Sequence, residues 1–317
     1  MPTKPERLRA GDTIGVIAPA SPPPNPGNID RAVAVLESLG WKARLAPNIR
    51  RRHGFLAGND RERAADVMRM FTDDRVRAIL CVRGGHGATR LLPRLDFAAI
   101  RAHPKIFIGY SDVTALLCAL RTQADLICFH GPMLNADFVA HGFPKFTREN
   151  FLRTLTQPVA PGGVCQGYTA KTVSVLRGGV TSGELVGGNL SVLCATIGTP
   201  WQPSFRRKIL FLEDLNEPPY RYDRMLTHLL NAGLLQQVAG VAVGLNRDCE
   251  DRTAGAAREY RQSLDDVLRE RLLPLKVPVV TGLPFGHVNA NATLPVGTRA
   301  ELNGRTGDLV FTAAAVR

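Results

Sequence analysis

Hydrophobic residues in the first half of the chain alternate between short continuous runs and runs with helical spacing. The continuous runs predict buried strands at 13–18, 76–82 and 105–108. Between them, apolar residues recur at the spacing of a helix with one buried face, at 29–39 and 59–71. Strands that alternate with helices favour a parallel sheet covered by helices. We therefore predict an α/β domain over residues 1–156.

Polar residues and a glycine mark the ends of these helices. Asn59 followed by Glu62 has the spacing of a capping box, in which the side chain and backbone of a helix's first turn bond reciprocally. Gly40 stands where glycine commonly follows a helix. These boundaries agree with the periodic pattern.

The second half of the chain has a different pattern. Residues 157–172 are rich in proline, glycine and polar residues and predict a linker. Beyond it, we expect a turn at 187–190, strands at 208–212, 238–245 and 277–281, and helices at 222–230 and 254–273. The tail alternates like a β structure, with Asn303-Gly304 as a hairpin turn. We predict a smaller, β-rich α+β domain over residues 173–317.

Two unusual turns follow neighbouring strands of the predicted parallel sheet. One is the glycine turn Arg83-Gly84-Gly85-His86-Gly87, and the other is Gly109-Tyr110-Ser111. Right-handed crossovers bring the turns after successive strands to one edge of a sheet. Ligands of open α/β sheets bind at that edge, so both turns predict one crevice.

Ser111 is the most informative residue of these turns because it lies between a strand and an amphipathic helix. A serine at such a turn has an outward hydroxyl next to backbone N–H groups that can hold an oxyanion. The helix itself is predicted from apolar residues that share one face, at 113, 116, 117 and 120. The alternative is that Ser111 or Asp112 simply caps this helix.

A serine nucleophile needs a base and a third group that orients the base. Among the seven histidines, His287 lies in a loop rich in glycine and proline directly after a predicted strand. Glu213 ends another predicted strand, where a carboxylate is held firmly. Asp214 and Glu217 are close competitors, and spacing does not separate the three.

Composition excludes several other classes. The chain of 317 residues is 44% hydrophobic and 21% charged, as in ordinary globular proteins. No apolar run approaches the roughly 20 residues of a membrane span, and residues 1–10 lack a secretory apolar core, so we expect a cytoplasmic protein. The six cysteines are scattered, and neither zinc-ligand nor phosphate-loop motifs occur, so no metal or cofactor is expected.

The formal charge of +12 invites a nucleic-acid function. The arginines are spread along the chain, however, and the two basic clusters at 50–52 and 206–208 have no interleaved aromatic residues. We therefore expect no nucleic-acid partner. A basic surface would equally attract a small substrate rich in carboxylates.

Six segments together resemble the serine L,D-carboxypeptidases that act on murein tetrapeptide, a family that also includes the microcin C self-immunity peptidases. Each segment is loose by itself, but six in order are specific. They are Gly11-Asp12-Thr13-Ile14-Gly15-Val16-Ile17-Ala18-Pro19-Ala20-Ser21, Arg83-Gly84-Gly85-His86-Gly87, Ile108-Gly109-Tyr110-Ser111-Asp112, Gly187-Gly188-Asn189-Leu190, Leu210-Phe211-Leu212-Glu213-Asp214 and Gly282-Leu283-Pro284-Phe285-Gly286-His287.

The resemblance implies a Ser-Glu-His triad with Ser111 as nucleophile, His287 as general base and then acid, and Glu213 as the group that orients the histidine. It also implies an oxyanion hole formed by the N–H groups of Asp112 and Gly85. The expected architecture is a flavodoxin-like N-terminal domain, a β-rich C-terminal domain and a site between them. A homodimer without metal or cofactor is expected.

The implied reaction releases the terminal D-alanine of murein tetrapeptide in peptidoglycan recycling. The alternative within the family is a self-immunity hydrolase that cleaves acyl-sulfamoyl adenylates, which is expected to stack a tryptophan on adenine. Trp41 opens an apparent strand and Trp201 follows a structural turn, so neither is an obvious stacking residue. The α/β-hydrolases share the Ser-Glu-His order, but Val113 stands where their G-x-S-x-G motif has its second glycine.

Overall fold

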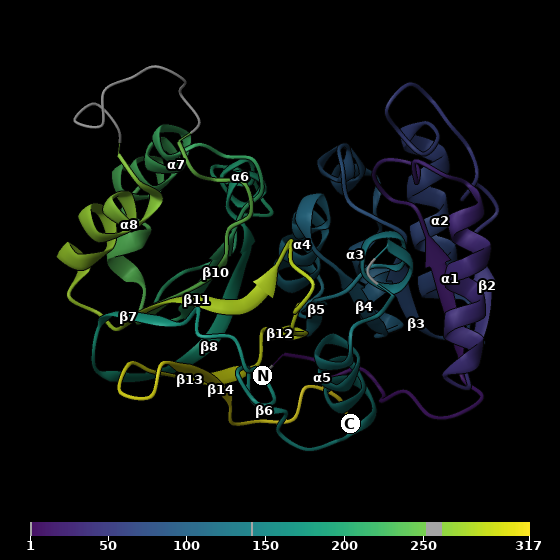
Figure 1. Ribbon diagram of the computed structural model, residues 1–317. Coiled ribbons are helices and arrows are strands. Elements are labelled where there is room, and N and C mark those ends of the chain that lie inside the picture. The colour runs from purple at the N-terminus through teal and green to yellow at the C-terminus, as the bar shows by residue number, and fades with distance from the viewer. Residues whose placement is uncertain (1, 141, 252–261) are drawn as a thin grey trace.

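Two sheets lie side by side in the computed structural model, each with helices packed on it (Figure 1). The structure describes residues 2–140, 142–251 and 262–317. The first sheet has the strand order β12-β5-β4-β3-β1-β2. Its strands are β1 (Thr13–Ile17), β2 (Lys42–Leu45), β3 (Val76–Cys81), β4 (Ile106–Gly109), β5 (Cys128–His130) and β12 (Leu294–Val296).

The first five strands of this sheet are parallel, and their order 2-1-3-4-5 is that of the flavodoxin-like fold, as predicted. The sixth strand, β12, comes from the second half of the chain and pairs antiparallel with β5. The α-helices of this half are α1 (Gly27–Ser38), α2 (Asp60–Thr72), α3 (Phe97–Ala102), α4 (Thr114–Gln123) and α5 (Lys145–Thr156). Shorter helical turns are η1 (Ala88–Arg94), η2 (Ser111–Val113) and η3 (Leu134–Ala140).

Two local sequence signals are found at the helix ends that they predict. Asn59 caps α2 through a complete capping box with Glu62, and each backbone N–H bonds the other side chain at 2.9 Å. Gly40 follows α1 with a φ of 86°, a conformation that glycine adopts without strain.

The second sheet has the strand order β6-β14-β13-β8-β9-β10-β11-β7. Its strands are β6 (Gly162–Gly163), β7 (Ser174–Arg177), β8 (Val180–Asn189), β9 (Ile209–Glu213), β10 (Gly240–Leu245), β11 (Val279–Gly286), β13 (Arg299–Asn303) and β14 (Asp308–Phe311). The helices α6 (Leu190–Cys194), α7 (Pro219–Asn231) and α8 (Leu264–Leu272) lie on one side of it, with the short turns η4 (Leu235–Gln237) and η6 (Leu273–Leu275) (Figure 1).

The centre of this β-rich sheet is parallel. Strands β8, β9, β10 and β11 run in one direction, while β7 and β13 pair antiparallel at their flanks. The predicted hairpin at Asn303-Gly304 joins β13 to β14. The second sheet therefore also presents a row of carboxyl ends, which the sequence did not lead us to expect.

Three segments differ from their predicted structure. The glycines at 187–188 were expected in a turn but end β8, where positive φ angles of 143° and 148° let an extended strand continue. The predicted loop at 282–286 belongs to β11, whose pairing with β10 shifts register twice to accommodate it. Within the predicted linker, Gly162–Gly163 pair with β14. Of the predicted helix at 254–273, the part before residue 262 lies outside the described residues.

The two halves share one hydrophobic core. Along β9, Leu210 and Leu212 face the helices α6 to α8, whereas Ile209 and Phe211 pack into the cluster that includes the first sheet. This alternation is the period of two that a strand buried on both faces requires. The second sheet is therefore packed against the first half on one face and against its own helices on the other.

The glycines at the end of β8 allow a close approach of backbones, which yields a stability prediction. A Cβ on Gly187 would lie 1.9 Å from the carbonyl oxygen of Phe211, and its φ is 143°. We expect Gly187→Ala to lower the free energy of unfolding by about 3 kcal/mol or more, because both the strained φ and the clash must be relieved. Urea denaturation measures this loss.

Gly40→Ala is the matched control for that substitution. Gly40 also has a positive φ, of 86°, but an added Cβ would meet nothing within 4 Å. We expect a loss of about 1–2 kcal/mol from the left-handed conformation alone. Equal losses for the two variants would contradict the clash at β8.

Candidate active site

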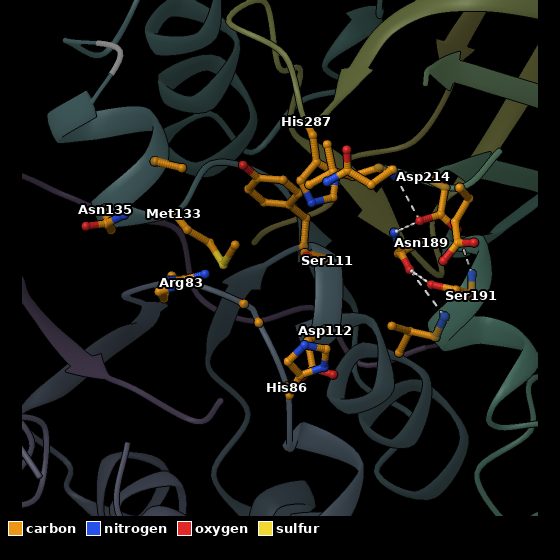
Figure 2. Close-up of a pocket in the computed structure, with 18 of the residues that line it drawn as sticks. Arg83, His86, Ser111, Asp112, Met133, Asn135, Asn189, Ser191, Asp214 and His287 are labelled. Carbon is orange, nitrogen blue, oxygen red and sulfur yellow. Dashed lines mark hydrogen bonds between the residues drawn. The ribbon is translucent and has the colours of Figure 1, made fainter. Parts of the chain in front are cut away.

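A cavity of about 650 Å³ opens where the carboxyl ends of both parallel strand sets meet (Figure 2). From the first half it is lined by the turns after β1, β3, β4 and β5, and from the second half by segments after β8, β9 and β11. Ser111, Asp112, Gly85 and His287 all line it. The crevice predicted at the edge of the first sheet is therefore closed by the second sheet.

Ser111 follows β4 directly and has a φ of 62°, an uncommon conformation for a residue with a side chain. It begins the turn η2, and neither η2 nor α4 has a side-chain cap bond at its N-terminus. The alternative that Ser111 or Asp112 caps the helix is therefore wrong. The backbone here is a sharp strand-to-helix turn that carries a partly exposed serine.

The glycine turn after β3 lies against Ser111. A Cβ on Gly84 would come within 2.9 Å of the Ser111 Oγ and 3.1 Å of the Asp112 backbone nitrogen, so only glycine leaves this space open. The buried carboxylate of Asp112 accepts a hydrogen bond of 2.8 Å from the N–H of Ala88. This bond fixes the end of the glycine turn to the serine turn.

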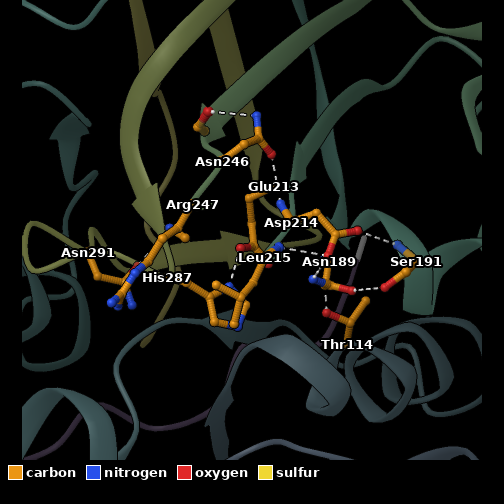
Figure 3. A network of polar contacts seen from close by, with 12 residues as sticks. Thr114, Asn189, Ser191, Glu213, Asp214, Leu215, Asn246, Arg247, His287 and Asn291 are labelled. Carbon is orange, nitrogen blue, oxygen red and sulfur yellow. Dashed lines mark hydrogen bonds and ion pairs between the residues drawn. The ribbon is translucent and has the colours of Figure 1, made fainter. Parts of the chain in front are cut away.

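His287 and Glu213 form a close polar pair at the site. The Nδ1 of His287 lies 2.7 Å from the Oε2 of Glu213, and the carboxylate is fully buried while the imidazole is 12% exposed (Figure 3). Glu213 ends β9 and His287 follows β11, two strands away in the sheet. The pair joins two strand ends at the floor of the cavity.

Burial and charge act in opposite directions on this pair. Burial would lower the pKa of His287, but the Glu213 carboxylate outweighs it, and the pKa of His287 is raised above its ordinary value. Burial would raise the pKa of Glu213, but the charge and hydrogen bond of His287 outweigh it, and this pKa is lowered. An ionised Glu213 only accepts hydrogen bonds, so Nδ1 carries the proton and Nε2 is the basic nitrogen.

The two competitors of Glu213 lie elsewhere. The Asp214 carboxylate accepts hydrogen bonds of 2.8 Å from the Asn189 side chain and from the backbone N–H of Ser191 (Figure 3). Burial, followed by the charge of Glu213, raises the pKa of Asp214 to about 6. Glu217 lies 3.8 Å from the guanidinium of Arg221. Of the three carboxylates, Glu213 is the one bonded to His287.

Asn189 connects the two halves beside the site. Its side-chain oxygen caps α6, its amide donates to Asp214, and its backbone N–H donates to the Thr114 hydroxyl of α4 over 3.1 Å. Thr114 is fully buried, and a Cβ on Gly188 would lie 2.4 Å from it. The helix that follows Ser111 therefore contacts the end of β8 directly.

The segment after His287 is fixed by side chains that the sequence did not single out. The buried Asn291 accepts a bond of 3.2 Å from the N–H of Gly286 and donates to Asp137 over 3.3 Å. Its backbone N–H donates to the hydroxyl of Thr147 in α5 over 2.9 Å. Asp137 lies in η3, and burial raises its pKa to about 6. The strand end that carries the histidine is thus clamped to the first half of the chain.

Tyr110 and His130 form a buried ring cluster behind the site. The Tyr110 ring lies edge-on to the ring of His287, with centroids 4.9 Å apart, and the His130 ring is 5.7 Å from it. His130 is fully buried at the end of β5, and burial lowers its pKa to about 4. His130 therefore stays neutral at physiological pH and limits the motion of the rings above it.

In the described residues, no group of three or more His, Cys, Asp or Glu side chains is arranged to hold a metal ion. No helix of the described chain is long and apolar enough to cross a membrane.

Comparison with known proteins identifies the family of the chain. Residues 14–131 match the LD-carboxypeptidase N-terminal domain, and residues 182–302 match the LD-carboxypeptidase C-terminal domain. The chain is 40% identical over 307 residues to a probable murein peptide carboxypeptidase of Bacillus subtilis, covering 95% of this chain and 91% of the relative.

Two solved structures extend the comparison to the fold. The muramoyltetrapeptide carboxypeptidase of Oxalobacter formigenes superposes with a TM-score of 0.82 and 34% identity, covering 94% of this chain and 97% of that one. A structure of MccF in complex with glutamyl sulfamoyl guanosine superposes with a TM-score of 0.88 and 26% identity over the full length of both. The chain belongs to the LD-carboxypeptidase family.

Proposed function

We propose that the protein is a serine L,D-carboxypeptidase that releases the terminal D-alanine of murein tetrapeptide. The observation that carries the proposal is that His287, bonded to the buried Glu213 at 2.7 Å, lines one cavity with a serine on a sharp strand-to-helix turn. Relatives named as murein peptide and muramoyltetrapeptide carboxypeptidases support the substrate class.

In the proposed reaction, the Ser111 hydroxyl attacks the carbonyl carbon of the bond between the diamino acid and D-alanine. The Nε2 of His287 takes the hydroxyl proton, while Glu213 stabilises the imidazolium that forms. His287 then gives this proton to the leaving amine, and D-alanine departs. A water molecule, deprotonated by the same nitrogen, hydrolyses the acyl-serine and restores the enzyme.

The oxyanion of each tetrahedral intermediate is proposed to accept hydrogen bonds from the backbone N–H groups of Asp112 and Gly85. The N–H of Gly85 belongs to the peptide that follows Gly84, and an added Cβ on Gly84 would lie 2.9 Å from the Ser111 Oγ. The bond from Ala88 to Asp112 holds the two turns in this relation. Donors fixed before the reaction stabilise the developing charge without reorganisation.

A self-immunity hydrolase acting on acyl-sulfamoyl adenylates is the second candidate, favoured by the superposition with MccF. The family resemblance implies that such an enzyme would place a tryptophan against the adenine. Trp41 is buried, packs on Phe151 and donates to the carbonyl of Arg9, and Trp201 does not line the cavity. The murein peptide is therefore the better candidate.

The family resemblance underlies two further proposals. We propose that the protein works in the cytoplasm on recycled murein peptides, and that it forms a homodimer. Light scattering on the purified protein measures the second of these.

We predict that the reaction requires the hydroxyl of Ser111. We expect Ser111→Ala to lower the rate of D-alanine release by about 10⁴-fold or more, because the covalent step is lost. The measurement is D-alanine release from murein tetrapeptide, with an acyl-sulfamoyl adenylate assayed separately. The thermal unfolding midpoint should stay unchanged. Release that survives the substitution would refute the mechanism.

We predict that the protonation of His287 sets the acid limb of the kcat/KM profile. Only neutral His287 acts as a base, and its raised pKa places the acid limb of the kcat/KM profile above the ordinary imidazole value of about 6.5. Glu213→Gln removes the carboxylate that raises this pKa and leaves the burial that lowers it. The acid limb should therefore move to lower pH, with kcat/KM reduced on the order of 10³-fold. An unmoved limb would contradict the assignment of this pair.

We predict that the reaction needs no metal ion. Nucleophile, base and oxyanion donors of the proposed mechanism are all protein groups, so dialysis against a chelator should leave kcat/KM within about twofold. Loss of activity that zinc restores would overturn the proposed mechanism.

A further inference from the structure

One end of the active-site cavity is lined by hydrogen-bond donors. Arg83 and Asn135 lie on one side of Ser111 in Figure 2, and Asn189, Ser191 and Asp214 lie on the other. Both residues on the donor side come from turns after strands of the first sheet, β3 and β5. The two ends of the cavity therefore differ in chemistry.

Arg83 is a cation whose capacity for hydrogen bonds is largely unused. Its guanidinium makes one long hydrogen bond, of 3.4 Å, to the carbonyl oxygen of Pro22. Among the described residues, no carboxylate lies within ion-pair distance of it. The side chain is half-buried at the cavity wall. A guanidinium has five N–H donors, so most of them remain for a ligand.

The orientation of the Asn135 amide follows from a chain of bonds that begins at α1. Arg31 is a donor only, and it donates to the Oδ1 of Asn28. The Nδ2 of Asn28 must therefore be the donor to Asn135, whose Oδ1 accepts at 2.7 Å. This leaves the NH₂ group of Asn135 as the part of the amide with free donors. Because Asn135 lines the cavity, those donors are available to a ligand beside Arg83.

Two donors at one end of a cavity, one of them a guanidinium, are suited to a carboxylate. In the proposed reaction, the carboxylate of the terminal D-alanine lies about one residue length, ~3.8 Å, beyond the bond that Ser111 attacks. Arg83 precedes Gly84, where an added Cβ would lie 2.9 Å from the Ser111 Oγ. The donor end therefore belongs to the same cavity as the nucleophile, and Arg83 directly precedes the glycine that lies against the serine turn.

Acidic groups in the cavity do not compete for this end. The Asp112 carboxylate points to Ala88, Asp214 accepts from Asn189 and Ser191, and Glu217 lies by Arg221. We propose that Arg83 and the side-chain amide of Asn135 bind the C-terminal carboxylate of the substrate and so restrict the enzyme to terminal residues. This inference rests on the proposed function and adds the residues that make it a carboxypeptidase.

The test compares tetrapeptide that ends in D-alanine with the same peptide capped as D-alaninamide. We expect Arg83→Met to lower kcat/KM for the free carboxylate by about 30- to 100-fold, the usual effect of losing a hydrogen-bonded ion pair. For the capped peptide, kcat/KM should change less than about threefold. Equal losses on both substrates would overturn the proposal, since a merely structural role of Arg83 predicts them.

Asn135→Asp is the second variant. It changes little except the amide N–H donors, which it replaces by a carboxylate oxygen. Its carboxylate keeps an acceptor for Asn28 and replaces the donors at the cavity by an acceptor. We expect a loss of at least tenfold for the free carboxylate and an unchanged or higher kcat/KM for the capped peptide. An unchanged ratio between the substrates would contradict the role of Asn135.

Arg52→Met is the matched control. The Arg52 side chain also donates to the proline loop, to the carbonyl of Pro23 over 3.0 Å, but it does not line the cavity. Its loss should leave the ratio of kcat/KM for the two peptides unchanged.

A binding measurement separates this inference from the proposed function. Calorimetry with N-acetyl-D-alanine and with its amide reports the carboxylate site without turnover. A preference for the free acid that disappears in Arg83→Met supports the site even if the wild type releases no D-alanine, which would refute the proposed function alone. No preference in the wild type would overturn the carboxylate site.

Discussion

The buried hydrogen bond between Glu213 and His287 is the interaction on which the rest of the site depends. Taking a carboxylate out of water costs several kcal/mol, and only a well-placed partner offsets this cost. The partner is a histidine on another strand, so both strand ends must be held in place. The bonds that hold the segment after His287 and the packing of Tyr110 against it serve this requirement.

Two parallel sheets explain how one chain assembles such a pair next to a serine. In each sheet, the loops that follow the parallel strands lie at the carboxyl ends of those strands. Here the two sets of loops face one cavity. The first sheet contributes the serine and glycine turns, and the second contributes the carboxylate and the histidine. Bonds between Thr114 and Asn189 and between Asn291 and Asp137 fix one set against the other. The site is therefore a property of the interface between the sheets.

What the sequence predicts well is local. The capping box at Asn59, the glycine after α1 and the strand-to-helix turn at Ser111 each depend on neighbours within a few residues. Local sequence does not decide between Glu213 and Asp214, because successive residues at a strand end point to opposite sides and the register decides which one meets the histidine. The family resemblance supplied what spacing left open.

Contacts between residues far apart in the sequence have no such local signal. Asn291 and Asp137 are 154 positions apart, and nothing in either segment indicates the other. The parallel centre of the second sheet was missed because Gly187 and Gly188 are typical of turns, whereas here they let β8 approach β9 and α4 closely. In both cases the deciding contact involves a backbone or side chain from another element.

The strand β12 has a consequence for how the chain can be divided. The chain leaves the second sheet after β11 and forms β12 at the edge of the first sheet, beside β5. It then returns to the second sheet as β13. A fragment that ended before this strand would expose the unpaired backbone of β5, flanked by the apolar residues of its two faces, and such edges invite aggregation. The two halves are thus interlaced by the chain's own path, and a split between them would separate β12 from the sheet that it completes.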